Sequence, residues 1–267
     1  MGAGIAEVLA RAGHPTQLQD LNDDLLASAR QRIHQSLERA QSKQKITAEQ
    51  AQRGRDNLVD HNRPDLIVEA VLEDIQVKIG ILQPLSHQHP EAILASNTSS
   101  LSLTQMAAAC HRPERVIGMH FFNPPPIMEL LEIVLAEQTD THTQQAVEQL
   151  ARQLGKTPIL VKDVPGFASS RLGIILGMEA IRMLESGVAS APDIDKAMEL
   201  GYRHPMGPLK LTDLVGLDVR LAIADHLTHE IGPQFTPPPL LRRLVRAGRL
   251  GKKTGRGFYR WNGNEAS

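Results

Sequence analysis

The sequence predicts an α/β fold: a Rossmann-type, doubly wound parallel sheet flanked by helices, followed by an all-α domain. Over residues 1–163, short apolar runs typical of strands alternate with longer segments whose apolar residues recur at helical spacing. This alternation is typical of βαβ units. Past the segment DVPGF no strand patterns follow, and the helical patterns there are separated by Gly and Pro. We therefore expect two domains, residues 1–163 and 164–267.

Composition and charge narrow the class of partner. The 267 residues carry 29 Lys and Arg against 30 Asp and Glu, and no long stretch is strongly basic. We therefore expect a small-molecule ligand and neither nucleic acid nor a membrane as partner. The single cysteine, Cys110, cannot form an internal disulfide. The sequence also lacks the CxxC pairs that are typical of zinc sites. These features predict a soluble cytoplasmic protein without a bound metal.

The expected elements follow from apolar patterning and turn residues. Strands are predicted at residues 16–20, 66–70, 92–96, 116–121, 130–135 and 158–161, with helices between them. In the second domain, helices are predicted at residues 167–185, 192–200, 208–230 and 239–247. The first of these four is apolar on nearly every face, so it must be buried on more than one side, in the domain core or at a subunit interface.

The chain opens on MGAGIAEVLARAGH, whose small residues and apolar spacing are typical of the helix after a phosphate-binding turn. The pattern GxGxxG fails there as written, because Glu7 occupies the third glycine position. If Gly2 is instead the third glycine, Asp20 lies about twenty residues further on, where a ribose-binding carboxylate is expected. Asp20 also ends a predicted strand ahead of a helix, and an Asp at such a place is more often an ordinary helix cap.

The segment GMHFFNPPPIMELLEIV places a histidine and a carboxylate on two neighbouring apolar strands. His120 closes the first strand, three prolines follow Asn123, and the next strand brings Glu132 back within reach. A carboxylate on a buried strand face needs a partner, and a His–carboxylate pair leaves the other ring nitrogen available as a general base. The alternative is a core histidine with Glu132 at a sheet edge.

The segment ASNTSSL follows another apolar strand. Asn97 and Ser99 would lie at the carboxyl-terminal edge of the sheet, where open α/β folds bind ligands, although a helix cap is the alternative. The sequence contains no GxSxG motif, so a serine hydrolase of the α/β-hydrolase type is not expected.

Six stretches taken in order resemble one family. VEAVLED, ASNTSSL, GMHFFNPPPIMELLEIV, KDVPGFASSRL, GYRHPMGPLKLTDLVGLD and GKKTGRGFY are similar to motifs of the L-3-hydroxyacyl-CoA dehydrogenases, including the 3-hydroxybutyryl-CoA dehydrogenases. The resemblance implies a Rossmann-type NAD-binding domain and an α-helical domain that binds substrate and forms a homodimer. It also implies NAD-dependent oxidation of L-3-hydroxyacyl-CoA to 3-oxoacyl-CoA, as in fatty acid β-oxidation.

The resemblance also implies roles for individual residues. His120 matches the general base, Glu132 its orienting carboxylate, and Ser99 a contact to both substrate and cofactor. Asn123 matches a ligand on the nicotinamide side. The remaining cofactor contacts implied are Met1, Gly2, Asp20, Glu73, Lys78 and Lys253. The implied contacts to coenzyme A are Ser36, Lys43 and Lys78.

The sequence departs from the family pattern at two places. Ser170 stands where the family has an asparagine that helps hold the substrate oxygen, and a serine hydroxyl has a shorter reach. Family members begin with a strand and GxGTMGxGIA, and Met1 and Gly2 coincide with the MG of that motif. We therefore expect that the sequence begins at an internal methionine and that the missing strand lies upstream.

Two other functions remain open on the sequence alone. One is oxidation of a 3-hydroxy acid that is not a thioester, such as L-gulonate, although Ser36, Lys43 and Lys78 favour coenzyme A. The other is a non-catalytic binding or structural role, which the early start favours and the pair of His120 and Glu132 opposes.

Overall fold

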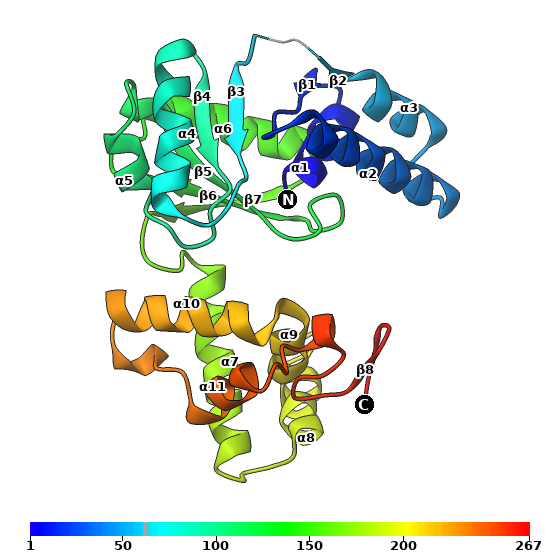
Figure 1. Cartoon of the computed structure of the whole chain (residues 1–267), viewed down its shortest axis with the longest axis vertical. Coiled ribbons are helices and arrows are strands. Elements are labelled where there is room, and N and C mark those ends of the chain that lie inside the picture. Colours follow the sequence, from blue (N-terminus) through cyan, green and yellow to red (C-terminus); the bar gives the residue numbers. More distant parts are fainter. Residues whose placement is uncertain (61–62) are drawn as a thin grey trace. The chain divides into compact units, whose positions relative to one another are not determined.

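The computed structural model describes residues 1–60 and 63–267, which form two compact units, Met1–Asp163 and Val164–Ser267 (Figure 1). The first unit contains the sheet, and the second is built almost wholly of helices. The predicted fold class, a Rossmann-like sheet followed by a helical domain, is confirmed.

The main sheet of the first unit has five strands in the order β3-β4-β5-β6-β7. Strands β3, β4 and β5 are parallel, β5 and β6 are antiparallel, and β6 and β7 are parallel again. The reversal arises because only a short loop joins β5 to β6, whereas parallel neighbours need a longer crossover. The strands are β3 (Leu66–Glu69), β4 (Ile93–Ser96), β5 (Val116–Phe121), β6 (Leu130–Leu135) and β7 (Thr157–Lys162).

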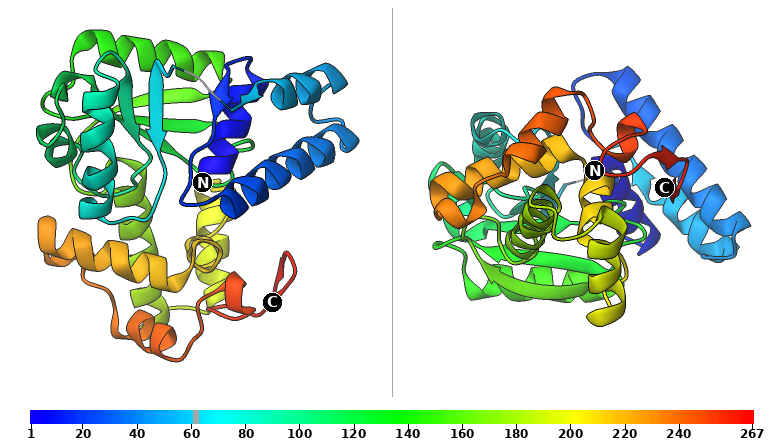
Figure 2. Two further views of the ribbon diagram at one scale, coloured as in Figure 1. Left: turned by 45° about the horizontal axis from the view of Figure 1, so that its top comes forward. Right: turned by 90° about the horizontal axis from the view of Figure 1, so that it is seen from below.

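Helices α4, α5 and α6 pack against the main sheet, whereas α2 and α3 form a pair to one side of it (Figure 2). A separate ladder pairs β1 with β2 in parallel over two residues each. These elements are α1 (Gly2–Arg11), β1 (Thr16–Gln17), α2 (Asp23–Ser42), α3 (Ala48–Asp56), β2 (Leu58–Val59), α4 (Ile75–Gln88), α5 (Leu103–Ala108), η1 (Pro113–Arg115) and α6 (Thr141–Gln153).

Alternation along β5 and β6 divides their side chains between the two faces of the sheet. One face, with Ile117 and Ile133, packs against Val8 of α1 and Val147 of α6 in a fully buried cluster. The opposite face includes Gly118 and Val134, which lie side by side in the ladder, and it meets α5. His120 and Glu132 belong to this second face by the same alternation.

The expected strands of the main sheet agree with the structure to within one residue at each end. The strand expected at 16–20 is wrong in extent, since β1 ends at Gln17 and Asp20 lies in an irregular segment before α2. Among residues 1–60 and 63–267, its ladder with β2 pairs Thr16 with Leu58 and Gln17 with Val59, and the ladder ends before Asp20.

The second unit is a helical domain with a small hairpin. Its core gathers apolar side chains from α7, α8, α9, α10 and α11, together with Phe235 and Tyr259. The elements are α7 (Ser169–Glu185), α8 (Ala191–Lys196), η2 (Ala197–Gly201), α9 (Pro208–Val215), α10 (Leu217–Glu230), η3 (Pro233–Phe235), α11 (Pro239–Arg246), η4 (Lys252–Thr254), β8 (Trp261–Asn262) and β9 (Glu265–Ala266).

Two features of this unit differ from the sequence-based expectations. The helix expected at 208–230 is two helices, because Gly216 has φ 109° and ends α9 before α10 begins. The β8–β9 hairpin was not expected. The first helix, α7, buries Ile174 and Met178 in the core, and its side chains Leu172 (63% exposed) and Leu176 (43% exposed) are the part for which a subunit interface was the expected alternative.

Two buried carboxylates hold the helical unit together. Asp195 accepts hydrogen bonds from the backbone N–H of Leu209, at the start of α9, and from the hydroxyl of Tyr259 at 2.7 Å. Asp213 accepts from the N–H of Tyr259 and from Nε1 of Trp261. Burial raises the pKa of Asp213 above its ordinary value, although these hydrogen bonds oppose that rise. The segment GKKTGRGFY, residues 251–259, is therefore anchored to α8 and α9 through its last residue, Tyr259, and through Trp261 just beyond it.

In the part of the chain that the structure describes, no helix combines the length and the apolar character that crossing a membrane requires.

Gly118 provides a test of the sheet packing. A Cβ at this position would lie 2.7 Å from Cβ of Val134, so Gly118→Ala should lower the free energy of unfolding by about 1–3 kcal/mol through overpacking. Gly80→Ala, in an exposed turn of α4 where a Cβ meets nothing within 4 Å, should instead raise it by about 0.5–1 kcal/mol. Urea denaturation of both variants measures the difference. Equal stability changes would contradict the close β5–β6 packing.

Candidate functional site

His120 and Glu132 face each other across the antiparallel β5–β6 ladder. Their register makes them a direct cross-strand pair, and Nδ1 of His120 lies 2.7 Å from Oε2 of Glu132. Glu132 is fully buried and His120 is 8% exposed. A carboxylate so enclosed favours the tautomer in which Nδ1 carries the proton, which makes Nε2 the basic nitrogen of the ring. The structure thus brings together the two residues that the sequence analysis paired.

The loop between these strands carries Asn123. This side chain is exposed, and the peptide bond to Pro124 is cis. The ring of Phe122 lies against the imidazole of His120, with ring centroids 4.7 Å apart. The loop therefore places an exposed amide three residues beyond His120.

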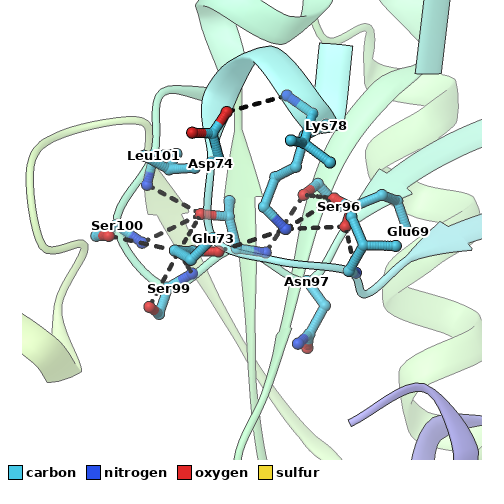
Figure 3. Close-up of polar contacts among 12 residues, drawn as sticks. Glu69, Glu73, Asp74, Lys78, Ser96, Asn97, Ser99, Ser100 and Leu101 are labelled. Carbon is cyan, nitrogen blue, oxygen red and sulfur yellow. Dashed lines mark hydrogen bonds and ion pairs between the residues drawn. The ribbon is translucent and has the colours of Figure 1, made fainter. Parts of the chain in front are cut away.

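Glu73 collects hydrogen bonds from the segment that follows β4 (Figure 3). Its Oε1 accepts from Oγ1 of Thr98 at 2.6 Å, from the N–H of Ser99 at 2.8 Å and from Oγ of Ser99 at 3.1 Å. Burial alone would raise the pKa of Glu73, but these hydrogen bonds and the nearby ammonium of Lys78 outweigh it and hold the pKa below its usual value. The Ser99 hydroxyl donates to Glu73, so its lone pairs remain as acceptors for a ligand.

The alternative role of ASNTSSL as a helix cap does not fit the structure. The cap of α5 is Ser102, which accepts from the N–H of Gln105. Oδ1 of Asn97 instead accepts from the N–H of Phe121 at 2.9 Å, which ties the end of β4 to the residue after His120.

A second buried ion pair lies behind Glu73. Nζ of Lys78 is 2.8 and 3.0 Å from the two carboxylate oxygens of Glu69 and 3.3 Å from Oε2 of Glu73 (Figure 3). Oγ of Ser96 donates to Glu69 at 2.6 Å. Lys78 is only 1% exposed, so its ammonium sits in the protein interior and not on the surface. Its contact with the solvent-facing part of this cluster is through Glu73.

The sequence analysis missed Glu69 and Ser96. The signal was available, because Glu69 ends the apolar run LIVE in the same way that Glu132 interrupts LLEIVL. A carboxylate on a buried strand demands a donor, and Lys78 lies nine positions further on.

The start of α1 offers backbone donors beside the sheet. The carbonyl of Met1 accepts from the N–H groups of Gly4 and Ile5, and the Met1 side chain makes no capping bond. A Cβ on Gly4 would lie 2.9 Å from Cδ of Pro125, so only glycine fits there. Gly2 lies near Ala70, just past β3. A helix start with small residues lets an anionic group approach the first-turn amides.

The other residues predicted from the first unit lie apart from this cluster. Asp20 is exposed and accepts from the N–H of Leu21. Ser36 is half-buried on α2 beside Glu7 of α1, and burial raises the pKa of Glu7 while the Ser36 hydroxyl opposes that rise. Lys43 is exposed and caps the end of α2.

Two predicted residues belong to the second unit. Ser170 is half-buried in the first turn of α7. Nζ of Lys253 lies 2.6 Å from Oδ1 of Asp218, at the start of α10, so this lysine has a carboxylate partner within its own unit.

The buried ion pair behind Glu73 yields a prediction about stability. Lys78→Met leaves the Glu69 carboxylate buried without its cation, so we expect a loss of about 3–5 kcal/mol in the free energy of unfolding. The double variant Glu69→Leu with Lys78→Met should recover most of that loss. Lys196→Met, which breaks an exposed pair with Asp193, serves as the control and should change nothing measurable. A Lys78→Met protein as stable as the control would contradict the pairing.

Comparison with known proteins shows the family to which the chain belongs. Family models described as the NAD binding domain and the C-terminal domain of 3-hydroxyacyl-CoA dehydrogenase match residues 1–164 and 166–261. The chain is 45% identical to a 3-hydroxybutyryl-CoA dehydrogenase of Mycobacterium tuberculosis, over 97% of this chain and 94% of that protein. It is 40% identical to the mitochondrial hydroxyacyl-coenzyme A dehydrogenase of Sus scrofa, over 98% and 88% of the two chains.

Solved structures of similar fold and sequence include 3-hydroxybutyryl-CoA dehydrogenases. The crystal structure of FadB2 from M. tuberculosis superposes with a TM-score of 0.93 at 44% identity, covering 98% of this chain and 95% of that one. The (S)-3-hydroxybutyryl-CoA dehydrogenase PaaH1 from Ralstonia eutropha gives a TM-score of 0.93 at 39% identity, with the same coverage of 98% and 95%. This chain therefore belongs to the 3-hydroxyacyl-CoA dehydrogenase family, and its first 164 residues are the NAD-binding domain of that family.

Proposed function

We propose that this protein oxidises the 3-hydroxyl group of a short-chain L-3-hydroxyacyl-CoA to a 3-oxo group, with NAD as the oxidant. The observation that carries the proposal is the buried contact of 2.7 Å between His120 and Glu132, on the sheet of an NAD-binding domain. The names of the relatives favour 3-hydroxybutyryl-CoA as substrate. The reaction would belong to fatty acid β-oxidation in the cytoplasm.

The chemistry divides between a proton and a hydride. NAD, when bound, supplies the acceptor for the hydride that leaves C3 of the substrate. Nε2 of His120 takes the proton from the 3-hydroxyl oxygen, and the C–O single bond becomes the carbonyl. Glu132 keeps the proton on Nδ1 and stabilises the imidazolium that forms. Burial of the pair strengthens this stabilisation, because little water screens the two charges.

The residues at the carboxyl ends of the strands fit NAD. The amides at the start of α1, with Met1 and Gly2, would receive the pyrophosphate. Asp20, exposed ahead of α2, would bind the adenosine ribose. The other cofactor contacts we propose are Glu73, Lys78 acting through Glu73, Ser99, Asn123 and Lys253.

Ser99 has a defined polarity in this scheme. Its hydroxyl proton is directed to Glu73, so Oγ would accept a hydrogen bond from the substrate hydroxyl or from the nicotinamide amide. Ser36 and Lys43, two turns apart on α2, would contact coenzyme A, with the exposed ammonium of Lys43 pairing with a phosphate.

We also propose a homodimer through the second unit. Large apolar side chains of α7 and α9 are exposed, and a second copy would remove them from water. They are Leu172, Leu176, Leu211, Leu214 and Val215.

The general base can be tested directly. His120→Ala should lower kcat by about 10²- to 10⁴-fold, because a positioned base contributes that much, while NAD binding survives. Glu132→Gln should also lower kcat, since the amide cannot stabilise an imidazolium. His229→Ala, at a side chain that is 86% exposed, is the control.

The assay follows NADH absorbance with 3-hydroxybutyryl-CoA and, separately, with free 3-hydroxybutyrate. Turnover of the free acid alone would contradict the thioester substrate. Wild-type turnover by Glu132→Gln would contradict the role of the pair.

Ser170 tests how the substrate oxygen is held. Ser170→Ala should lower kcat/KM by a few-fold up to about tenfold, which corresponds to one hydrogen bond of roughly 0.5–1.5 kcal/mol. Ser170→Asn, which restores the amide of the family pattern, should retain or raise kcat/KM. Unaltered constants in the alanine variant would mean that Ser170 does not contact substrate.

A further inference from the structure

Lys156 is a buried lysine in the turn between α6 and β7. It is 8% exposed, and its Nζ donates hydrogen bonds to the carbonyl oxygens of Pro125 at 2.6 Å and Met128 at 2.7 Å. Both acceptors belong to the loop of residues 122–129 that joins β5 to β6, which we call the proline loop. An ammonium group thus enters this loop from the side of the sheet and binds two of its carbonyls.

The charge of Lys156 is balanced by dipoles. Across residues 1–60 and 63–267, no carboxylate lies within ion-pair distance of its Nζ. Burial lowers the pKa of Lys156, and Arg11 adds to that effect, while Glu129 opposes it. Placing a cation here is costly, so the two short hydrogen bonds to carbonyls must compensate for lost hydration. A hydrophobic residue would fill this space without that cost if only packing mattered.

The proline loop is held at several further points. The N–H groups of Ile127 and Met128 donate to the carbonyl of Pro124, which closes a turn inside the loop. The N–H of Thr157, next to Lys156, donates to the carbonyl of Glu129 at 2.9 Å. Lys156 and Thr157 together therefore fix the second half of the loop to the start of β7.

Two parts of the proposed NAD site depend on where this loop lies. Asn123 is carried by the loop itself. Pro125, whose carbonyl binds Lys156, packs its ring against Gly4 in the first turn of α1. A shift of the loop would therefore move both Asn123 and Pro125, the residue against which the first turn of α1 packs. His120 and Glu132 are held separately, by the β5–β6 ladder.

We propose that Lys156 is a positioning residue that fixes the proline loop and thereby sets the geometry of the NAD site. The proposal rests on the proposed function for the identity of the ligand. It separates two tasks: the sheet positions the proton-transfer pair, and the Lys156 ammonium positions the groups that contact the cofactor.

The test uses the whole protein with Lys156→Met, which preserves chain length and removes the donors. Lys162→Met, at the exposed far end of β7, is the matched control. NADH binding is measured by fluorescence titration without acyl-CoA, and hydrogen exchange is followed at the amides of Ile127 and Met128. Steady-state constants are then measured with NAD and 3-hydroxybutyryl-CoA.

We expect Lys156→Met to weaken NADH binding and to lower kcat/KM for NAD by about 10- to 10²-fold, as displacement of about 1 Å does. Exchange at Ile127 and Met128 should quicken while the β5–β6 amides stay protected, and KM for the acyl-CoA should change little. If Lys156→Met does not fold, Lys156→Gln, which retains one donor, is measured in the same way.

A lower melting temperature with unchanged NADH affinity and unchanged loop exchange would overturn the proposal, because Lys156 would then be merely structural. A wild-type protein that binds NADH but does not turn over 3-hydroxybutyryl-CoA would contradict the proposed function instead. The comparison of NADH affinity between Lys156→Met and Lys162→Met would still decide the role of Lys156.

Discussion

Carboxylates buried on the strands of the main sheet are the constraint on which this site depends. An unpaired buried carboxylate is costly, so each one fixes the position of a donor from another element. Glu132 on β6 fixes His120 on β5, and Glu69 on β3 fixes Lys78 on α4. The reactive groups are ordered because the charges behind them leave few alternatives. Glu73 extends the same principle to the backbone and hydroxyl of Ser99.

The antiparallel step in the sheet is what makes the histidine pair possible. In a wholly parallel sheet, β5 and β6 would be joined by a long crossover, and residues twelve apart would not meet. The short proline loop reverses the chain, so His120 and Glu132 become direct cross-strand neighbours on one face. Asn97 links β4 to the end of β5, through the N–H of Phe121, so that the two buried pairs belong to one connected framework.

Much of this arrangement could be predicted from the sequence. Apolar periodicity located the five strands of the main sheet. The position of Glu132 within an apolar strand indicated that its carboxylate would have a hydrogen-bonding partner. The break at Gly216 could not be predicted, because the apolar positions continue in helical spacing across a residue whose φ depends on tertiary contacts. The carbonyl acceptors of Lys156 could not be predicted either, because every residue carries a backbone carbonyl and the sequence does not indicate which of them a lysine will bind.

The two buried lysines of the first unit show how the same chemical group can serve two purposes. Lys78 meets the carboxylates of Glu69 and Glu73, which neutralise it, so in the proposed site any effect on a ligand would pass through Glu73. Among the described residues, Lys156 is instead stabilised by hydrogen bonds to two carbonyl dipoles, without a carboxylate at ion-pair distance. A positive field from this direction favours the anionic pyrophosphate that the start of α1 is proposed to receive. In the proposed site, Lys156 would therefore contribute to the potential in which the cofactor binds as well as fix the proline loop.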